Sequence, residues 1–219
     1  MKKLFYVLYF FLLLIACISQ KPEKKEITFI NDAVARAKQS NKLLILEISS
    51  PGCVSCAMLN KDVFLNEKNS QFLDDNFIII HVSPADSVYV PLRNRFGLDN
   101  QSSVIFFDHN GNELDRTVNY DGNKEAYLDF IRDVSQGKNL YSVVFSAYKK
   151  DTLNVHNCYL MAEKFRFRNM PVNAIKQYKK ILASDRYNNF GLNQECKHKI
   201  EKARIMQLNN YDQEILGSQ

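Results

Sequence analysis

The chain has 219 residues, of which 46% are hydrophobic and 24% are charged. A chain of this length forms one large domain or two small ones, and its apolar content is sufficient for a core. The composition excludes a disordered chain, a collagen-like repeat and a small disulfide-dense scaffold. The formal net charge of +5 is spread along the chain, which argues against a nucleic-acid binder with a concentrated basic patch.

Residues 1–16 have the layout of a secretory signal. Two lysines precede a nearly unbroken apolar run that ends at Ala16, and this run is shorter than the ~20 residues that a membrane-spanning helix needs. Its end, Leu14-Ile15-Ala16-Cys17, resembles the lipobox of bacterial lipoproteins, which implies a lipid on Cys17 as the first mature residue. The alternatives are an uncleaved anchor, or an ordinary signal followed by a chance cysteine.

The lipoprotein interpretation predicts a compartment for the mature chain. A lipid on Cys17 would hold it in the cell envelope at the inner or the outer membrane, facing the periplasm. Disulfides form and persist in that compartment. Residues 17–26 are polar and lack periodicity, so we predict that they form a tether between lipid and domain.

From residue 27 onward, helical and strand patterns alternate. We expect first a helix from Asn31 or Asp32 to about Gln39, a strand over 43–48 and a turn over 49–52. Helices over 53–63 and 66–74, a strand over 77–82 and a helix over 88–96 should follow. Strands over 104–107 and 113–118, joined by a hairpin at Asn110-Gly111, and a helix from Asn123 complete the pattern. Parallel units followed by an antiparallel hairpin imply an α/β fold with one mixed sheet flanked by helices.

The C-terminal third shows no strand pattern. Gly137 marks a boundary, and residues 140–210 are predicted to form an all-α segment with helices over 153–167, 171–183 and 192–208. Residues 158–186 resemble one tetratricopeptide repeat. Because such repeats normally stack in groups of three or more, this segment is expected to dock on the preceding domain or to bind a partner. The alternative is a mere packing extension.

The motif Cys53-Val54-Ser55-Cys56 lies where a predicted strand passes through a turn into a predicted helix. The first cysteine then sits at the helix N-terminus, where unpaired N–H groups and the helix dipole favour the thiolate. The second cysteine lies one turn further in, within reach of a mixed disulfide formed by the first. The pattern predicts Cys53 as the attacking and Cys56 as the resolving thiol. The alternative is a structural disulfide in an inactive domain.

The order and spacing of residues 27–136 resemble the thioredoxin superfamily, and most closely its extracytoplasmic members related to the C-terminal domains of periplasmic disulfide reductases. The resemblance rests on residues 33–48, on the two-cysteine motif, on residues 64–77 and on residues 104–111. It implies a thioredoxin-like mixed sheet and thiol–disulfide chemistry. No organic cofactor is implied, because the cysteines themselves carry the electrons.

Glu47 is the third residue to which the resemblance assigns a catalytic role. It lies six residues before Cys53, within an otherwise apolar run. In the superfamily an acidic residue at this spacing lies beneath the disulfide and moves the proton of the resolving cysteine. Burial disfavours a charged carboxylate, which suits acid/base work near neutral pH. The alternative is a glutamate at the strand edge that reaches solvent.

Two positions depart from the superfamily pattern. Gly52 precedes the first cysteine where tryptophan is usual. Ser102-Ser103 stand where the superfamily usually has a Pro-Thr pair whose proline is cis. A non-proline cis bond costs ~3 kcal/mol, so this peptide is expected to be trans. We expect substrate contacts from Gly52, Val54 and Ser55 around the cysteines, and from Ser102 and Ser103 in the facing loop.

The remaining cysteines and the histidines offer no clear further site. Cys158 and Cys196 lie in the apolar stripes of predicted helices, which favours buried free thiols. A disulfide between them and an electron relay to the motif are the alternatives. The four histidines are scattered and no second Cys-x-x-Cys is present, so no metal site is predicted.

The sequence therefore predicts a membrane-anchored thiol–disulfide oxidoreductase of the cell envelope. Its partners would be protein thiol or disulfide substrates, a redox protein that donates or accepts electrons, and the membrane through the lipid on Cys17; no nucleic acid is expected. The alternative is a non-catalytic thioredoxin-like scaffold whose helical tail binds a protein partner.

Overall fold

The computed structural model of the chain describes residues 22–98 and 101–217. The predicted signal peptide at 1–16, the predicted lipidation site Cys17 and the first half of the predicted tether lie outside the described residues. Among the helices that are described, none is long and apolar enough to cross a membrane.

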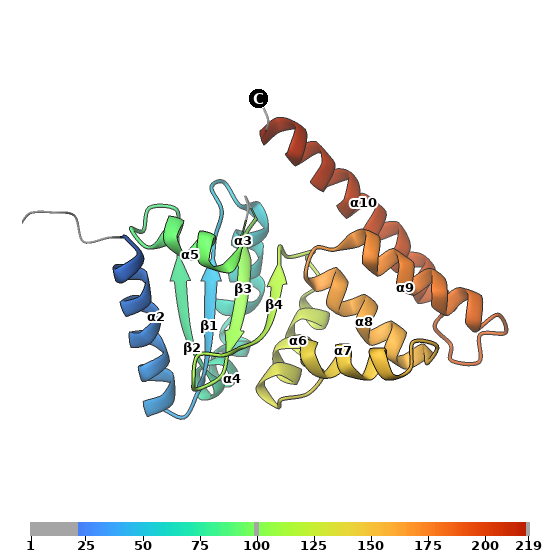
Figure 1. The fold of residues 1–219 in the computed structure, drawn as a ribbon, viewed down its shortest axis with the longest axis horizontal. Coiled ribbons are helices and arrows are strands. Elements are labelled where there is room, and N and C mark those ends of the chain that lie inside the picture. The colour runs from blue at the N-terminus through green and yellow to red at the C-terminus, as the bar shows by residue number, and fades with distance from the viewer. Residues whose placement is uncertain (1–21, 99–100, 218–219) are drawn as a thin grey trace, which may run out of the picture.

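Four strands form one mixed sheet in the order β2-β1-β3-β4 (Figure 1). The strands are β1 (Leu43–Ile48), β2 (Phe77–Val82), β3 (Ser103–Phe107) and β4 (Glu113–Val118). Strand β1 pairs with β2 in parallel and with β3 antiparallel, and β3 pairs antiparallel with β4. The sequence-based prediction of a mixed sheet is confirmed.

Helices cover both faces of this sheet. They are α2 (Pro22–Gln39), α3 (Val54–Leu59), the π-helical turn η1 (Asn60–Phe64), α4 (Glu67–Asn76), α5 (Tyr89–Phe96) and α6 (Lys124–Ser135). Buried residues of α2 and α5 pack with Leu44, Leu46 and Ile48, whereas those of η1, α4 and α6 pack with Ile45. Since side chains alternate along a strand, Glu47 points to the same face as Ile45, beneath α3 and η1.

Helix α2 begins at Pro22, nine residues before the predicted start at Asn31. Residues 22–26, which the sequence analysis assigns to the tether, are therefore helical. The residues there are mostly glutamate and lysine, which have high helix propensity. Further along α2, Ile30, Ala33 and Ala37 are buried at helical spacing, and their burial anchors the helix on the sheet.

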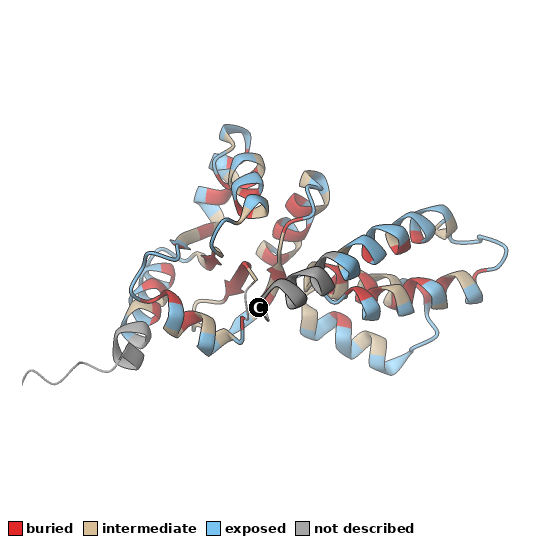
Figure 2. Cartoon of the chain, turned by 90° about the horizontal axis from the view of Figure 1, so that it is seen from above, coloured by how far each residue is buried: buried red, intermediate tan, exposed pale blue. Residues whose placement is uncertain are grey.

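The C-terminal segment is all-helical, as predicted, but it holds one helix that the sequence did not reveal. Its helices are α7 (Tyr141–Lys150), α8 (Val155–Phe167), α9 (Pro171–Ser184) and α10 (Asn193–Gly217). Helix α7 was not predicted; Val144 is its one buried residue, and its place is set by contacts with α8 and β4. Figure 2 shows the buried residues of this helical tail gathered between its helices.

Charged and aromatic side chains fix the helical tail against β4 and α6. Asp115 of β4 is fully buried and pairs with Lys164 at 2.6 Å and with Arg168 at 3.0 Å. Beside it, the ring of Phe167 lies 4.8 Å from that of Phe130 in α6. In Figure 1 the tail accordingly lies beside β4, at the end of the sheet opposite β2.

Candidate active site at the Cys53–Cys56 turn

A tight turn carries the chain from β1 into α3. The amide of Cys53 donates a hydrogen bond to the carbonyl of Ser50 at 3.2 Å, which closes the turn. Gly52 has a φ of +65°, a left-handed conformation that glycine adopts without strain. The usual tryptophan would be strained at this position, so the local backbone accounts for Gly52.

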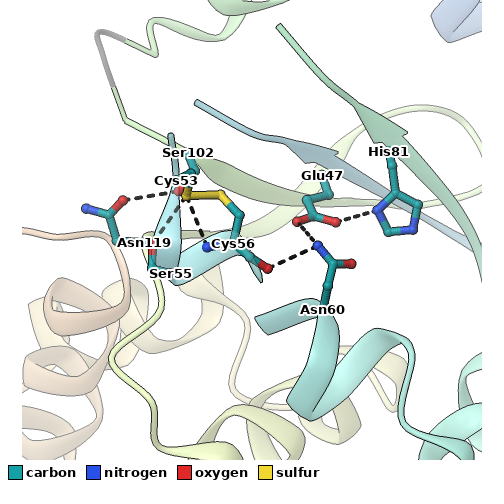
Figure 3. Close-up of a disulfide and its surroundings, with 8 residues drawn as sticks. All are labelled: Glu47, Cys53, Ser55, Cys56, Asn60, His81, Ser102 and Asn119. Carbon is teal, nitrogen blue, oxygen red and sulfur yellow. Dashed lines mark hydrogen bonds and ion pairs between the residues drawn. A yellow bond between two sulfur atoms is a disulfide. The ribbon is translucent and has the colours of Figure 1, made fainter. Parts of the chain in front are cut away.

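The two cysteines form a disulfide at the start of α3 (Figure 3). Cys53 is the N-cap residue, and its Sγ accepts a hydrogen bond from the amide of Cys56 at 3.0 Å. The hydroxyl of Ser55 lies 3.4 Å from the same sulfur. Hydrogen bonds to a sulfur favour its charged form, so these donors would stabilise a thiolate at Cys53 after reduction.

The two cysteine residues differ in their access to solvent. Cys53 is partly exposed, whereas Cys56 is 7% exposed and belongs to the core. Val54, between them, is 73% exposed and presents an apolar surface at the turn. An incoming disulfide can therefore reach Cys53 but not Cys56.

Glu47 lies in the interior beneath this turn, with 1% of its surface exposed. One carboxylate oxygen accepts a hydrogen bond from the side-chain amide of Asn60 at 3.0 Å, and the other is bonded to Nδ1 of His81. The alternative in which Glu47 reaches solvent at a strand edge is therefore wrong.

Asn60 and His81 are site residues that the sequence analysis missed. The side-chain amide of Asn60 donates both to Glu47 and to the carbonyl of Cys56, each at 3.0 Å, and so joins the carboxylate to the resolving cysteine's backbone. His81 faces Glu47 across the parallel β1–β2 pair, and 49% of its side chain is exposed. The chain of contacts thus runs from Cys56 through a buried carboxylate to a solvent-facing imidazole (Figure 3).

A small cavity of about 10 Å³ lies between the Glu47 carboxylate and Cys56. Glu47, Cys56 and Ser103 are among the residues that line it. Its size is close to the room that one buried water molecule needs. A single water there would connect Cys56 to Glu47.

Ser102 and Ser103 lie beside the disulfide, but their side chains point away from solvent. They are 6% and 2% exposed, and their hydroxyls bond to Asn119 at 3.1 Å and to the carbonyl of Thr117 at 2.9 Å. Within residues 22–98 and 101–217 no peptide bond is cis. Only the backbone of these serines could contact a substrate, and their hydroxyls instead bind β4 and the turn after it.

Cys158 and Cys196 are free cysteines in the core of the helical tail. Burial raises the pKa of both thiols, that of Cys196 to about 11. A thiol of this kind is a poor nucleophile near neutral pH. In the described ranges, no group of three or more His, Cys, Asp or Glu residues could hold a metal ion.

Comparison with known proteins found two similarities. Residues 26–104, which include the turn, match a family model described as thioredoxin-like. No curated protein gives a significant match. A solved structure of a disulphide isomerase from Xylella fastidiosa Temecula1 is similar over 49% of this chain and 89% of its own length, with 18% identity and a TM-score of 0.41.

Proposed function

Because the chain carries a thioredoxin-like domain with a disulfide at the start of its first helix after β1, we propose that it is a thiol–disulfide oxidoreductase acting on protein disulfides. One observation carries this proposal. Cys53 is partly exposed and its sulfur accepts the backbone N–H bond, whereas Cys56 is buried and lines a cavity together with a carboxylate. This asymmetry separates an attacking thiol from a resolving thiol, and a merely structural disulfide does not require it.

The reaction begins with the reduced protein. The Cys53 thiolate attacks a substrate disulfide; a bond forms between Cys53 and one substrate sulfur, and the other sulfur leaves as a thiolate that takes a proton from solvent. Cys56 then loses its proton and attacks Cys53. The Cys53–substrate bond breaks, the second substrate thiol leaves, and the Cys53–Cys56 disulfide forms. The substrate gains two electrons and the protein loses two; the same steps in reverse oxidise a substrate dithiol.

Glu47 is the group that accepts the Cys56 proton in this scheme. Its carboxylate lines the same small cavity as Cys56, and Asn60 holds one of its oxygens in place. The His81 contact provides a route for the proton from the buried carboxylate to solvent, because half of the imidazole is exposed. Asn60 and His81 act through Glu47 and are positioning residues.

The Glu47→Gln variant tests this role. It keeps the shape of the side chain but cannot accept a proton, so release of the mixed disulfide by Cys56 should slow on the order of 10²-fold near neutral pH. Rapid-quench measurement on the reduced full chain, with a protein disulfide as substrate, would follow each step. The initial attack by Cys53 should be much less affected. The exposed Glu67 offers a matched control: Glu67→Gln should leave both steps at the wild-type rate, and equal rates in both variants would rule out the relay.

We further propose that the chain acts from a lipid anchor on Cys17, in the cell envelope and facing the periplasm. The support is the charged start, the short apolar run and the small residue before this cysteine. Expressed in a bacterium that processes lipoproteins, the chain should incorporate radiolabelled palmitate, and Cys17→Ser should abolish the label. Incorporation that survives Cys17→Ser would contradict the anchor.

A further inference from the structure

A groove of about 380 Å³ joins the active-site turn to the helical tail. Its walls come from α3, from the turn after β4, from α8 and from α10, and its lining includes Ser55, Tyr120, Phe167, Lys202, Ile205 and Met206. Ser55 lies 3.4 Å from the reactive sulfur of Cys53. A molecule lying in this groove would therefore contact a residue that itself touches the Cys53 sulfur.

The groove exposes an apolar side chain on its α10 wall. Ile205, which lines the groove, is 59% exposed, and Phe167 and Met206 line it as well. Exposed apolar surface that faces a groove beside a reactive centre gains free energy when an apolar ligand covers it. These walls suit a polypeptide with an apolar side chain near its disulfide.

The charges in the groove leave one cation available. Arg166 is 5% exposed and is engaged by Asp121 and by Glu163, the latter at 3.0 Å. Lys202, by contrast, is exposed and makes no ion pair with any residue in the described part of the chain. Because the Asp121 and Arg166 charges offset each other, the groove presents a net positive charge at Lys202. This charge is complementary to an acidic side chain.

Ion pairs hold the tail helices against the sheet and against one another. Lys164 and Arg168 of the α8 region pair with buried Asp115, and Lys199 of α10 pairs with Glu163 of α8 at 2.8 Å. The groove therefore exists before a substrate binds, which lowers the ordering cost of binding.

We propose that this groove binds an extended polypeptide segment that carries an apolar residue and an acidic residue beside its disulfide. This inference rests on the proposed exchange reaction and deepens it by giving the substrate class. Helix α10 supplies the specificity, since Ile205 covers the apolar side chain and Lys202 pairs with the acidic one. Small disulfides, which cannot span the groove, would react without this contribution.

The test compares three substrates with the reduced full chain. Two are short synthetic peptides whose single cysteine is joined by a disulfide to mercaptoethanol; each has a leucine next to the cysteine, and they differ only in a glutamate or a lysine beyond it. The third is the uncharged small disulfide of mercaptoethanol itself. Second-order rate constants are measured by acid quench and chromatography. The wild-type protein should favour the glutamate peptide over the lysine peptide by at least about threefold.

Two variants of α10 should change these rates in different ways. Lys202→Glu should reverse the preference between the two peptides, and Ile205→Asp should slow both peptides by about tenfold and far more than it slows the small disulfide. Matched controls are Lys197→Glu on the same helix and Val172→Asp on α9; both residues are exposed, and neither is among the residues that line the groove. These controls should leave the wild-type pattern intact.

The outcomes distinguish a failure of the proposed substrate binding in the groove from a failure of the proposed exchange reaction. If the Lys202→Glu variant still prefers the glutamate peptide, the proposal that the groove binds the substrate is wrong. The proposal is also wrong if Ile205→Asp slows all three substrates equally. A wild-type protein that reduces none of the three disulfides would instead overturn the proposed oxidoreductase activity on which the groove depends.

Discussion

The Cys56→Ala variant of the full chain is expected to accumulate a stable mixed disulfide between Cys53 and its protein substrates, whereas Cys53→Ala should form none. In Cys56→Ala the partly exposed Cys53 can still attack, but no resolving thiol lies behind it. Overall turnover should fall below detection in both variants. Non-reducing electrophoresis followed by mass spectrometry of the adducts checks the result and identifies the trapped partners.

A cysteine distant from the site gives the control for trapping. Cys158 is buried in the tail and its thiol donates to the carbonyl of Thr152 at 3.3 Å, a bond that a serine can keep. Cys158→Ser should therefore turn over normally and trap nothing. Adducts that form through Cys56 in the Cys53→Ala variant would reverse the assigned roles. The absence of adducts in every variant would favour a non-catalytic scaffold.

The Asp115→Ala variant is expected to lose about 3–5 kcal/mol of unfolding free energy. Asp115 accepts from Lys164, Arg168 and the amide of Tyr141 at 2.6, 3.0 and 3.0 Å. Its removal leaves the Lys164 ammonium buried without its partner, which costs far more than the loss of a surface ion pair. For a chain of this size the melting temperature should fall by roughly 6–20 °C, as measured by calorimetry.

An exposed aspartate provides the matched control. Asp129 pairs with Arg132 at 2.8 Å, but 73% of its side chain is exposed. Asp129→Ala should therefore cost less than about 1 kcal/mol. Equal losses in the two variants would show that Asp115 does not hold the tail to the sheet.

The pH dependence of the Asp115→Ala loss follows from Lys164. Burial lowers the pKa of this lysine in the folded protein, and Asp115 opposes that effect. Without Asp115 the folded-state pKa falls further, so the unfolded chain binds more protons between the two values and stability rises with pH across that window. The cost of Asp115→Ala should be smaller near about pH 10 than near about pH 7. A cost that does not change with pH would exclude the unpaired ammonium as its cause.

Local patterns were sufficient to predict the sheet and most of the helices. The apolar run at 43–48 fitted a central strand covered on both faces, and the Asn110-Gly111 pair matched the turn between β3 and β4. Helix α7 is placed by its contacts with α8 and β4, which its local sequence does not specify. The early start of α2 was missed because its first residues are polar.

In the candidate site too, residues close to the motif in sequence could be predicted, whereas a residue on another strand could not. The spacing of Cys53 and Cys56 depends on one turn, so the sequence could bring the two cysteines together, and the resemblance to thioredoxins implied a place for Glu47 beneath them. His81 lies 34 residues after Glu47 in the chain. The two residues meet only because β2 pairs with β1 in a register that places them opposite each other. Asn60 lies four residues after Cys56, and this helical spacing is a signal that could have placed it near the motif.

A redox titration of the Cys53–Cys56 pair tests the proposed function most directly. The full chain is equilibrated with dithiol and disulfide buffers across a range of potentials, and the alkylated fraction of each cysteine is determined by mass spectrometry. A thiol–disulfide oxidoreductase should show one reversible two-electron transition between roughly −300 and −100 mV. A pair that stays oxidised under strong reductant would contradict catalysis and leave the disulfide with a structural role.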